Sequence, residues 1–348
     1  MFKWILGIVF SLCLIVAGLY GYLVRSYTTA DPPESGQLKL DSLVVNKLER
    51  TFTYYLPEQL GEQLGEQPAL VFVLHGSMGS GGDIRWQTAY GFEHLAQTEN
   101  LIPVYPNGFE NHWNDCRASA NYSANTQNIN DPAFFKAMVA YFRQHYDIDD
   151  QRVFATGLSN GGHMSYRLAL EVPELVRAIA PMAASLPVKN NNDCGVRGKP
   201  VSVALFNGTN DPINPYGGGL VELMGDSSRG SVQSSDQTMD YWRVLAGIPS
   251  QPSRQWQVTT EKKPGPVAQV TEWSANGEVM RLYKLLDSGH VVPSSQVHFG
   301  RLFGGDAPQI EAADEIWEFF NSLEEKREPS SAPVVPPEEG SEQLAGRH

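Results

Sequence analysis

The stretch that decides the fold of this chain is Arg152-Val-Phe-Ala-Thr-Gly-Leu-Ser-Asn-Gly-Gly-His-Met-Ser-Tyr-Arg167. It begins with an apolar run at residues 153–155, which predicts a short buried strand. Apolar side chains at helical spacing follow over residues 164–170. Between the two lies a Gly-x-Ser-x-Gly pattern at residues 157–161. The stretch therefore predicts a strand, a tight turn and the start of a helix.

Ser159 stands at the centre of this turn and is a candidate nucleophile. A bare Gly-x-Ser-x-Gly match also occurs by chance in loops rich in glycine and serine. The strand-turn-helix context favours the functional interpretation, because a serine there has a strained backbone and an exposed hydroxyl. The N-terminus of the following helix also favours developing negative charge.

Buried strands alternate with helices on both sides of this stretch. Continuous apolar runs predict strands, and amphipathic segments predict helices. This alternation predicts an α/β fold with a mostly parallel central sheet flanked by helices. The expected strands are residues 51–56, 69–74, 101–106, 178–183, 201–206, 254–259, 270–273 and 279–286, and the expected helices are 86–99, 132–146, 238–245 and 312–323.

The ends of the chain differ from its middle. Residues 4–24 are almost unbroken apolar sequence, which is long enough to span a bilayer. We expect residues 1–25 to be an uncleaved signal anchor rather than a cleaved signal peptide. Residues 26–40 are expected to be a tether, residues 41–323 one catalytic domain, and residues 324–348 a disordered tail rich in proline, glutamate and serine.

This organisation predicts an exported protein. Its catalytic domain would lie outside the cytoplasm, held at the membrane by the N-terminal segment alone, or it would be secreted if that segment is cleaved. Cys116 and Cys194 could form a disulfide in such a compartment, or they could remain two separate thiols.

Charge and composition limit the partners. The net charge is −13, and the sequence has no run of lysine and arginine, which argues against nucleic acid. The cysteine and histidine spacing does not resemble a metal site, so neither a metal nor another cofactor is expected.

A serine nucleophile needs a base, and the base needs an acid to orient it. His290 follows the strand expected at residues 279–286 and comes after Ser159, whereas most of the other histidines precede the serine. Asp211 follows the strand expected at residues 201–206; an Asx turn before Pro212 is the structural alternative. Serine, aspartate and histidine then occur in the order of α/β-hydrolases.

A glycine-rich loop, residues 75–82, directly follows the buried run at 69–74. The Asn160 N–H and a second N–H, from Ser77 or Met78, are expected to form an oxyanion hole. A flexible loop with no such role is the alternative.

Two irregular segments are candidates for substrate contact. Residues 109–130 form a long polar stretch with Trp113 and Tyr122, and a loop of this length is usually functional or disordered. We expect it to face the substrate. Residues 220–236 are rich in glycine and serine and are a candidate flap over the site.

The chain resembles the polyhydroxybutyrate-depolymerase-type esterases, which include relatives of the feruloyl esterases. The resemblance covers roughly residues 40 to 320, in the order of the family. The matching segments are Leu74-His-Gly76, Tyr105-Pro-Asn-Gly108, Trp113-Asn114, Asn130-Asp131 with Phe134, Arg152 to Gly162, Gly208-Thr-Asn-Asp-Pro-Ile-Asn-Pro-Tyr216, Gly289-His290 and Ile316-Trp-Glu-Phe-Phe320.

The resemblance implies an α/β-hydrolase fold with Ser159 as nucleophile, Asp211 as acid and His290 as base. From the matching motifs we expect Trp113, Asn114 and Tyr216 to contact the substrate. Relatives commonly carry a Trp-Pro pair after the catalytic histidine, but this chain has Val291-Val292-Pro293. This departure predicts a different pocket wall.

The sequence therefore predicts a serine esterase that acts through an acyl-enzyme. One alternative is a serine peptidase or amidase, which could use the same three residues. The other is a catalytically silent module that binds a partner in the cell envelope; the presence of all three residues argues against it.

Overall fold

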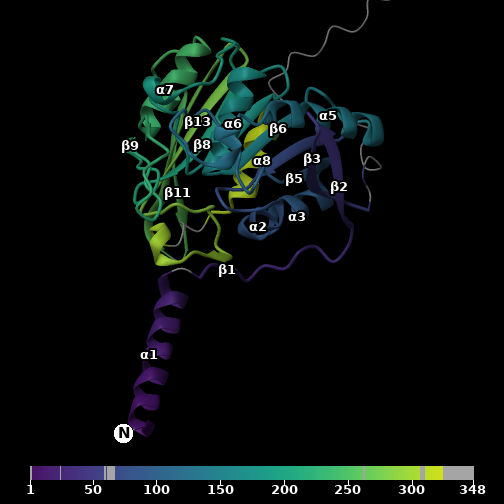
Figure 1. The fold of residues 1–348 in the computed structure, drawn as a ribbon. Helices are drawn as coiled ribbons and strands as arrows, with labels where there is room; N and C mark the ends of the chain where they lie inside the picture. The colour runs from purple at the N-terminus through teal and green to yellow at the C-terminus, as the bar shows by residue number, and fades with distance from the viewer. Residues whose placement is uncertain are drawn as a thin grey trace, which may run out of the picture.

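The structure is a computed structural model that describes residues 2–23, 25–58, 60, 67–261, 263–305 and 310–323. Within these residues a ten-stranded sheet has the order β11-β12-β13-β8-β7-β6-β4-β5-β3-β2 (Figure 1). The six strands from β13 to β5 run parallel, and the strands at both edges pair antiparallel. The expected α/β-hydrolase fold, with a mostly parallel centre, is confirmed.

The strands of this sheet have the following bounds: β2 Gln37–Val45, β3 Leu48–Leu56, β4 Ala69–Leu74, β5 Leu101–Pro106, β6 Val153–Leu158, β7 Ala178–Met182, β8 Ser202–Gly208, β11 Arg254–Thr260, β12 Lys263–Ala275 and β13 Glu278–Leu285. The main helices are α2 Gly81–Gln87, α3 Gly91–Thr98, α5 Asp131–Tyr146, α6 Asn160–Glu171, α7 Ser235–Leu245 and α8 Ala312–Ser322. A short helix, α4 (Ser123–Thr126), lies in the long polar loop.

Two helical layers cover the two faces of the sheet. Successive side chains of a strand point to opposite faces, so β4 contributes to both layers. Ala69, Val71 and Val73 pack with residues of α2, α3 and α8, whereas the alternate residues of β4 pack with residues of α5, α6 and α7. All six residues of β4 are buried, as expected for a strand covered on both faces.

The carboxyl ends of β4, β6, β8 and β13 meet at one edge of the sheet because these strands are parallel. The segments that follow them carry the glycine-rich loop, Ser159, Asp211 and His290. Ligands bind at this edge in open α/β sheets. The topology thus brings four segments that are distant in sequence to the same side of the molecule.

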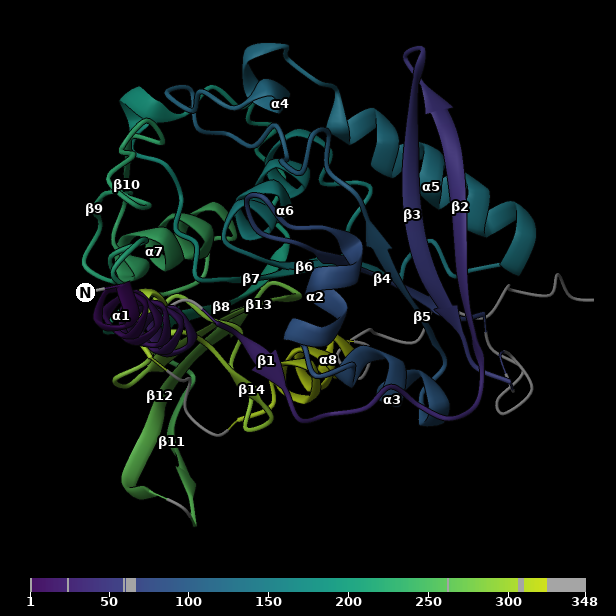
Figure 2. The ribbon, with the colours of Figure 1, turned by 60° about the horizontal axis from the view of Figure 1, so that its bottom comes forward.

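Three expectations for the elements are corrected. The single helix expected at residues 86–99 is two helices, because Ala89 and Tyr90 adopt left-handed φ angles of 52° and 54° between α2 and α3. Strand β2 begins inside the expected tether. The tether also contains β1 (Tyr27–Thr28), which pairs with β14 (Val297–His298) (Figure 2).

Helix α1 (Phe2–Leu23) extends away from the domain (Figure 1). Among the described residues, none of the helices is both apolar and long enough to cross a membrane. The signal anchor expected for residues 1–25 stays a prediction. The tail expected to be disordered, residues 324–348, lies outside the described residues.

Candidate active site

Ser159 occupies the turn between β6 and α6. Its backbone has a φ of 54° and a ψ of −115°, a conformation that non-glycine residues rarely adopt. Its N–H donates to the Met182 carbonyl at 2.8 Å, and its carbonyl accepts from the His163 N–H at 2.9 Å. The strain is therefore held by hydrogen bonds to β7 and α6, as expected of a nucleophile turn.

The glycines around Ser159 allow a very close approach of backbone segments. A Cβ atom at Gly161 would lie 2.4 Å from the Leu74 carbonyl oxygen, and one at Gly157 would lie 2.7 Å from the Gly161 carbonyl carbon. Any side chain there would push α6 away from β4. The Gly-x-Ser-x-Gly pattern thus reflects tight packing of the turn.

His290 and Asp211 are brought together from the ends of β13 and β8. His290 Nδ1 lies 2.7 Å from Asp211 Oδ2, and both residues are buried. Asp211 Oδ1 accepts from the N–H groups of Ile213 and Asn214, each at 2.8 Å. The Asx-type turn and the histidine contact thus coexist, because each uses a different oxygen of the carboxylate.

This arrangement orients the imidazole ring. A carboxylate can only accept a hydrogen bond from Nδ1–H, which assigns the neutral tautomer with Nε2 unprotonated. The backbone N–H of His290 also donates to the Phe303 carbonyl at 2.6 Å, which fixes the main chain that carries the ring. Nε2 is then the nitrogen available to accept a proton.

Ser159 and His290 line the same cavity, which has a volume of about 170 Å³. Its walls are largely apolar, and it is closed on one side by residues 221–229, inside the segment expected to be a flap. The lining residues are Ser26, Gly76, Ser77, Met78, Gly79, Gln87, Leu158, Ser159, Ile213, Val221, Leu223, Met224, Arg229, His290, Phe299 and Phe303.

The glycine-rich loop after β4 brings Ser77 and Met78 to the cavity. The Met78 N–H donates to the Asn111 carbonyl at 2.9 Å, so it is already engaged. This contact argues against Met78 as an oxyanion donor and leaves Ser77 of the two candidates. Asn160 is the first residue of α6, where backbone N–H groups lack partners within the helix.

Two other histidines near the serine are buried rather than catalytic. Burial lowers the pKa of His75 to about 4, and its ring nitrogens contact the Gly76 carbonyl and the Gly108 N–H. Burial also holds the pKa of His163 well below its usual value, with the charge of Arg117 acting in the same direction. Both rings are therefore neutral near pH 7.

Trp113 and Asn114, which we expected to contact the substrate, do not line this cavity. Trp113 is fully buried, with its indole N–H donated to the His75 carbonyl at 3.0 Å. Asn114 is 3% exposed and bonds to Asp131, Asn128 and Ile129. These side chains hold the polar loop against the core, so neither reaches the cavity.

The other two expectations for the pocket concern Tyr216 and the residues after His290. Tyr216 does not line the cavity; its hydroxyl lies 3.4 Å from Asp236 Oδ1, and Lys284 lies over its ring. Val291 and Val292 are buried in the core rather than in a pocket wall. Neither valine lines this cavity, so the different pocket wall expected from the missing Trp-Pro pair stays a prediction.

The polar loop instead builds a buried network behind α6. The Asp115 carboxylate accepts from Arg117 Nη2 and from Asn160 Nδ2, each at 2.6 Å, and from the Tyr122 hydroxyl at 2.8 Å. Burial alone would raise the pKa of Asp115, but the positive charge of Arg117 lowers it to about 2. Asn160, next to the serine, is thus fixed by an ionised carboxylate.

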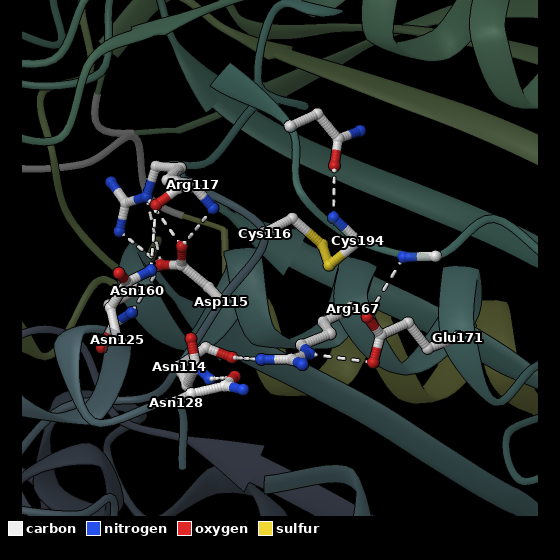
Figure 3. The surroundings of a disulfide bond; sticks show 12 residues. Asn114, Asp115, Cys116, Arg117, Asn125, Asn128, Asn160, Arg167, Glu171 and Cys194 are labelled. Atoms are coloured by element: carbon white, nitrogen blue, oxygen red, sulfur yellow. Dashed lines mark hydrogen bonds and ion pairs between the residues drawn. A yellow bond between two sulfur atoms is a disulfide. The ribbon is translucent and has the colours of Figure 1, made fainter. Parts of the chain in front are cut away.

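A disulfide joins Cys116 to Cys194 beside this network (Figure 3). Of the two states that the sequence left open, the structure has the paired one. On the neighbouring helix α6, Arg167 donates to the Asn114 carbonyl at 2.6 Å and pairs with Glu171 at 3.0 Å. The disulfide therefore fastens the polar loop next to the helix that follows Ser159.

Sequence reasoning missed several residues of the cavity. Phe299 and Phe303 lie in a short irregular segment after His290, and Ser26 comes from the expected tether. Nothing in the local sequence marks these residues as neighbours of Ser159. Arg229 lies in the expected flap, yet it was not singled out as a binding residue.

The sequence of this chain is similar to those of known esterases. The model of an esterase family, described as "Putative esterase", matches residues 45–292. "Probable feruloyl esterase C" of Aspergillus niger is 32% identical over 157 residues, covering 43% of this chain and 52% of the relative. "Feruloyl esterase C" of Emericella nidulans is 30% identical over 197 residues, covering 55% of this chain and 66% of the relative. The chain thus spans less than two thirds of either relative.

Among solved structures, the acetyl xylan esterase from Aspergillus awamori has a TM-score of 0.52 and 18% sequence identity. The match covers 81% of this chain and 99% of that chain. At this identity the likeness supports the fold alone.

Proposed function

Because the chain belongs to the esterase family whose model it matches, we propose that it is a serine esterase that hydrolyses carboxylic esters. Ser159 is the nucleophile, His290 the general base and Asp211 the acid that orients the histidine. The contact between His290 and Asp211 at 2.7 Å, at the cavity that Ser159 also lines, is the observation that carries the proposal.

In the first half of the reaction, His290 Nε2 takes the proton of the Ser159 hydroxyl as the oxygen attacks the ester carbonyl. The Asp211 carboxylate stabilises the imidazolium that forms. The N–H groups of Asn160 and Ser77 bind the negative oxygen of the tetrahedral intermediate. His290 then donates its proton to the departing alcohol, which leaves an acyl group on Ser159.

In the second half, a water molecule donates a proton to His290 and attacks the acyl carbonyl. The same N–H groups stabilise the second tetrahedral intermediate. Its collapse releases the carboxylic acid, and the proton returns from His290 to Ser159. These steps use side chains and backbone groups of this chain alone.

The names of the relatives suggest which esters to consider as substrates. The relatives are named as feruloyl esterases, and a structural neighbour as an acetyl xylan esterase. We propose that this chain acts on small or oligomeric esters, because its cavity is only about 170 Å³ and is partly closed by residues 221–229. A polyester substrate has no support beyond the resemblance.

The test is hydrolysis of p-nitrophenyl acyl esters of increasing chain length, together with methyl ferulate, by the full-length chain. Ser159→Ala should remove activity on every ester, and the preferred acyl group reports the size of the cavity. Activity that survives in Ser159→Ala would refute the assignment of the nucleophile. Cleavage of amides rather than esters would favour a serine peptidase or amidase.

A silent module that binds an envelope partner remains the alternative from another class. It predicts a folded protein that turns over neither esters nor amides. The shared cavity of Ser159 and His290 favours an enzyme instead.

We also propose that the domain works outside the cytoplasm. The disulfide between Cys116 and Cys194 supports this, since disulfides persist in oxidising compartments. Cell fractionation tests it: the domain should be recovered outside the cytoplasm with this disulfide intact. Recovery in the membrane fraction would favour the anchor expected for residues 1–25, and recovery in the medium a cleaved signal.

A further inference from the structure

One wall of the cavity is a short hairpin, residues 219–232, here called the flap. Strand β9 (Gly219–Leu220) pairs antiparallel with β10 (Ser231–Val232). Figure 2 shows the two strands close to α7. The flap contributes Val221, Leu223, Met224 and Arg229 to the cavity lining. It therefore lies over the site, as its composition suggested.

Asn191 fixes the backbone of the flap at Arg229. Its Nδ2 donates to the Arg229 carbonyl at 3.0 Å and to the Ser231 carbonyl at 3.1 Å. The Asn191 carbonyl in turn accepts from the Ala118 N–H at 2.9 Å, close to the disulfide at Cys116. Arg229 thus extends from a backbone that is tied to the body of the domain.

Within the part of the chain that the structure describes, the positive charge of the Arg229 guanidinium has a single ion-pair partner. The residue is only 7% exposed, and its Nη1 donates to Asp226 Oδ2 at 2.9 Å. The Asp226 side chain is 46% exposed, so solvent screens this ion pair. A buried cation with one solvated partner retains an unfavourable desolvation energy, which a second anion would offset.

The charge of Arg229 contrasts with the rest of the cavity lining, which is mostly apolar or neutral. Among the described residues that line the cavity, Arg229 is the one with a permanent charge, and none is a carboxylate. The chain as a whole has a net charge of −13, so a cationic wall is not a consequence of composition. The field of Arg229 also reaches His112, whose pKa is lowered first by burial and further by this guanidinium.

We propose that Arg229 makes this site selective for esters that carry a carboxylate. The inference rests on the proposed function, since it names the substrate class of the same cavity. A guanidinium presents its N–H donors in a planar fork that matches the two oxygens of a carboxylate. The carboxylate would lie on the acyl part or on the alcohol part of the ester, away from the carbonyl that Ser159 attacks.

The experiment compares an anionic ester with a neutral ester of similar shape, using the full-length chain. Monoethyl adipate and ethyl hexanoate test a carboxylate on the acyl part. Para-acetoxybenzoate and its methyl ester test a carboxylate on the alcohol part. For each pair, the ratio of kcat/KM between anionic and neutral ester is measured at low and high salt.

Arg229→Gln is the test variant, and Arg243→Gln is its matched control. Arg243 also pairs with an exposed aspartate three residues away, Asp240, but lies on α7 outside the cavity. Arg229→Gln should lower the anionic-to-neutral ratio roughly ten- to a hundredfold for one of the two pairs, the range expected for losing a charge-assisted hydrogen bond. Arg243→Gln should leave the ratio at its wild-type value.

The pair that responds identifies the part of the substrate that bears the carboxylate. If neutral esters are still hydrolysed and Arg229→Gln leaves both ratios unchanged, the inference is wrong while the esterase proposal stands. An equal loss of activity on both members of a pair would also overturn it, because it would assign Arg229 a structural role.

A binding measurement separates the inference from the proposed function. Adipate and para-hydroxybenzoate, which carry the carboxylate of the acyl part and of the alcohol part, are each titrated calorimetrically into Ser159→Ala and into Ser159→Ala with Arg229→Gln. Binding that requires Arg229 supports anion recognition even if no ester is turned over. Binding that is absent, or equal in the two variants, contradicts it.

Discussion

At the residue scale, the candidate site depends on charges held in low-dielectric surroundings. Asp115 illustrates this, because its carboxylate binds Arg117, Tyr122 and Asn160 while fully buried. Removing one partner of such a buried ion pair leaves the other uncompensated, which costs about 3–5 kcal/mol of unfolding free energy. Asp115 is therefore expected to stabilise the backbone next to Ser159 without touching the substrate.

The pH dependence of stability tests this role. The pKa of Asp115 is lowered from 3.8 to about 2, so the fold is stabilised while this carboxyl is ionised. That contribution, about 2 kcal/mol, is present above pH 4 and is lost as the pH falls toward 2. Urea unfolding of wild type and Asp115→Asn should therefore show a difference that is large at pH 7 and smaller at pH 3.

Asp240→Asn is the control for this comparison, because the Asp240 side chain is 66% exposed. Its unfolding free energy should stay within about 0.5 kcal/mol of wild type at either pH. A difference between wild type and Asp115→Asn that is constant from pH 7 to pH 3 would contradict the account.

Some residues of the candidate site could be predicted from the sequence, and others could not. Ser159, Asp211 and His290 could be selected because each follows a run typical of a buried strand, and such strands end at one edge of the sheet. Trp113 and Asn114 were misassigned because an aromatic or amide side chain in a polar loop gives no sign of its burial. The engagement of the Met78 N–H depends on Asn111, which local sequence does not reveal.

At the scale of elements, the disulfide fastens the polar loop to the segment after β7. Cys116 and Cys194 are 78 residues apart, so the bond restricts a large loop in the unfolded chain. Loop-closure entropy gives about 4 kcal/mol for a loop of this size. The double substitution Cys116→Ser with Cys194→Ser should therefore lower the thermal unfolding temperature by several degrees.

Cys13→Ser is the matched control, since Cys13 is an exposed free cysteine. Differential scanning calorimetry with and without reductant should shift wild type and Cys13→Ser equally and leave the double variant unchanged. A double variant as stable as wild type would show that the disulfide does not stabilise the domain.

The elements differ in how well sequence predicts them. The buried central strands were predicted because continuous apolar runs have few alternatives, as with β4 and β8. Edge strand β2 was not predicted at all, since its partly exposed residues resemble those of a linker. The break between α2 and α3 requires left-handed residues at Ala89 and Tyr90, which their side chains do not signal.

At the scale of the whole molecule, the N-terminal segment contributes to the cavity that Ser159 lines. Ser26 lines the cavity, and its hydroxyl lies 3.4 Å from the Gly300 N–H. Strand β1 follows directly and pairs with β14, and the Thr29 N–H donates to the Gln296 carbonyl at 2.9 Å. No local pattern predicts a contact between segments about 270 residues apart.

Deletion of residues 1–30 should therefore alter catalysis. It removes Ser26 from the cavity wall and β1 from its pairing with β14, so KM for ethyl hexanoate should rise several-fold with little change in unfolding temperature. Deletion of residues 1–24 keeps both features and is the control. Identical steady-state kinetics for the two deletions would contradict a role of this segment in the cavity.

The central claim is that Ser159 is a nucleophile activated by His290. The most direct measurement is labelling of the full-length chain with a fluorophosphonate probe, followed by mass mapping of the adduct. One adduct, on Ser159, is predicted; it should be absent from Ser159→Ala and strongly slowed in His290→Ala, while circular dichroism shows both variants folded. An adduct on another residue, or no adduct on a folded wild-type protein, would contradict the claim.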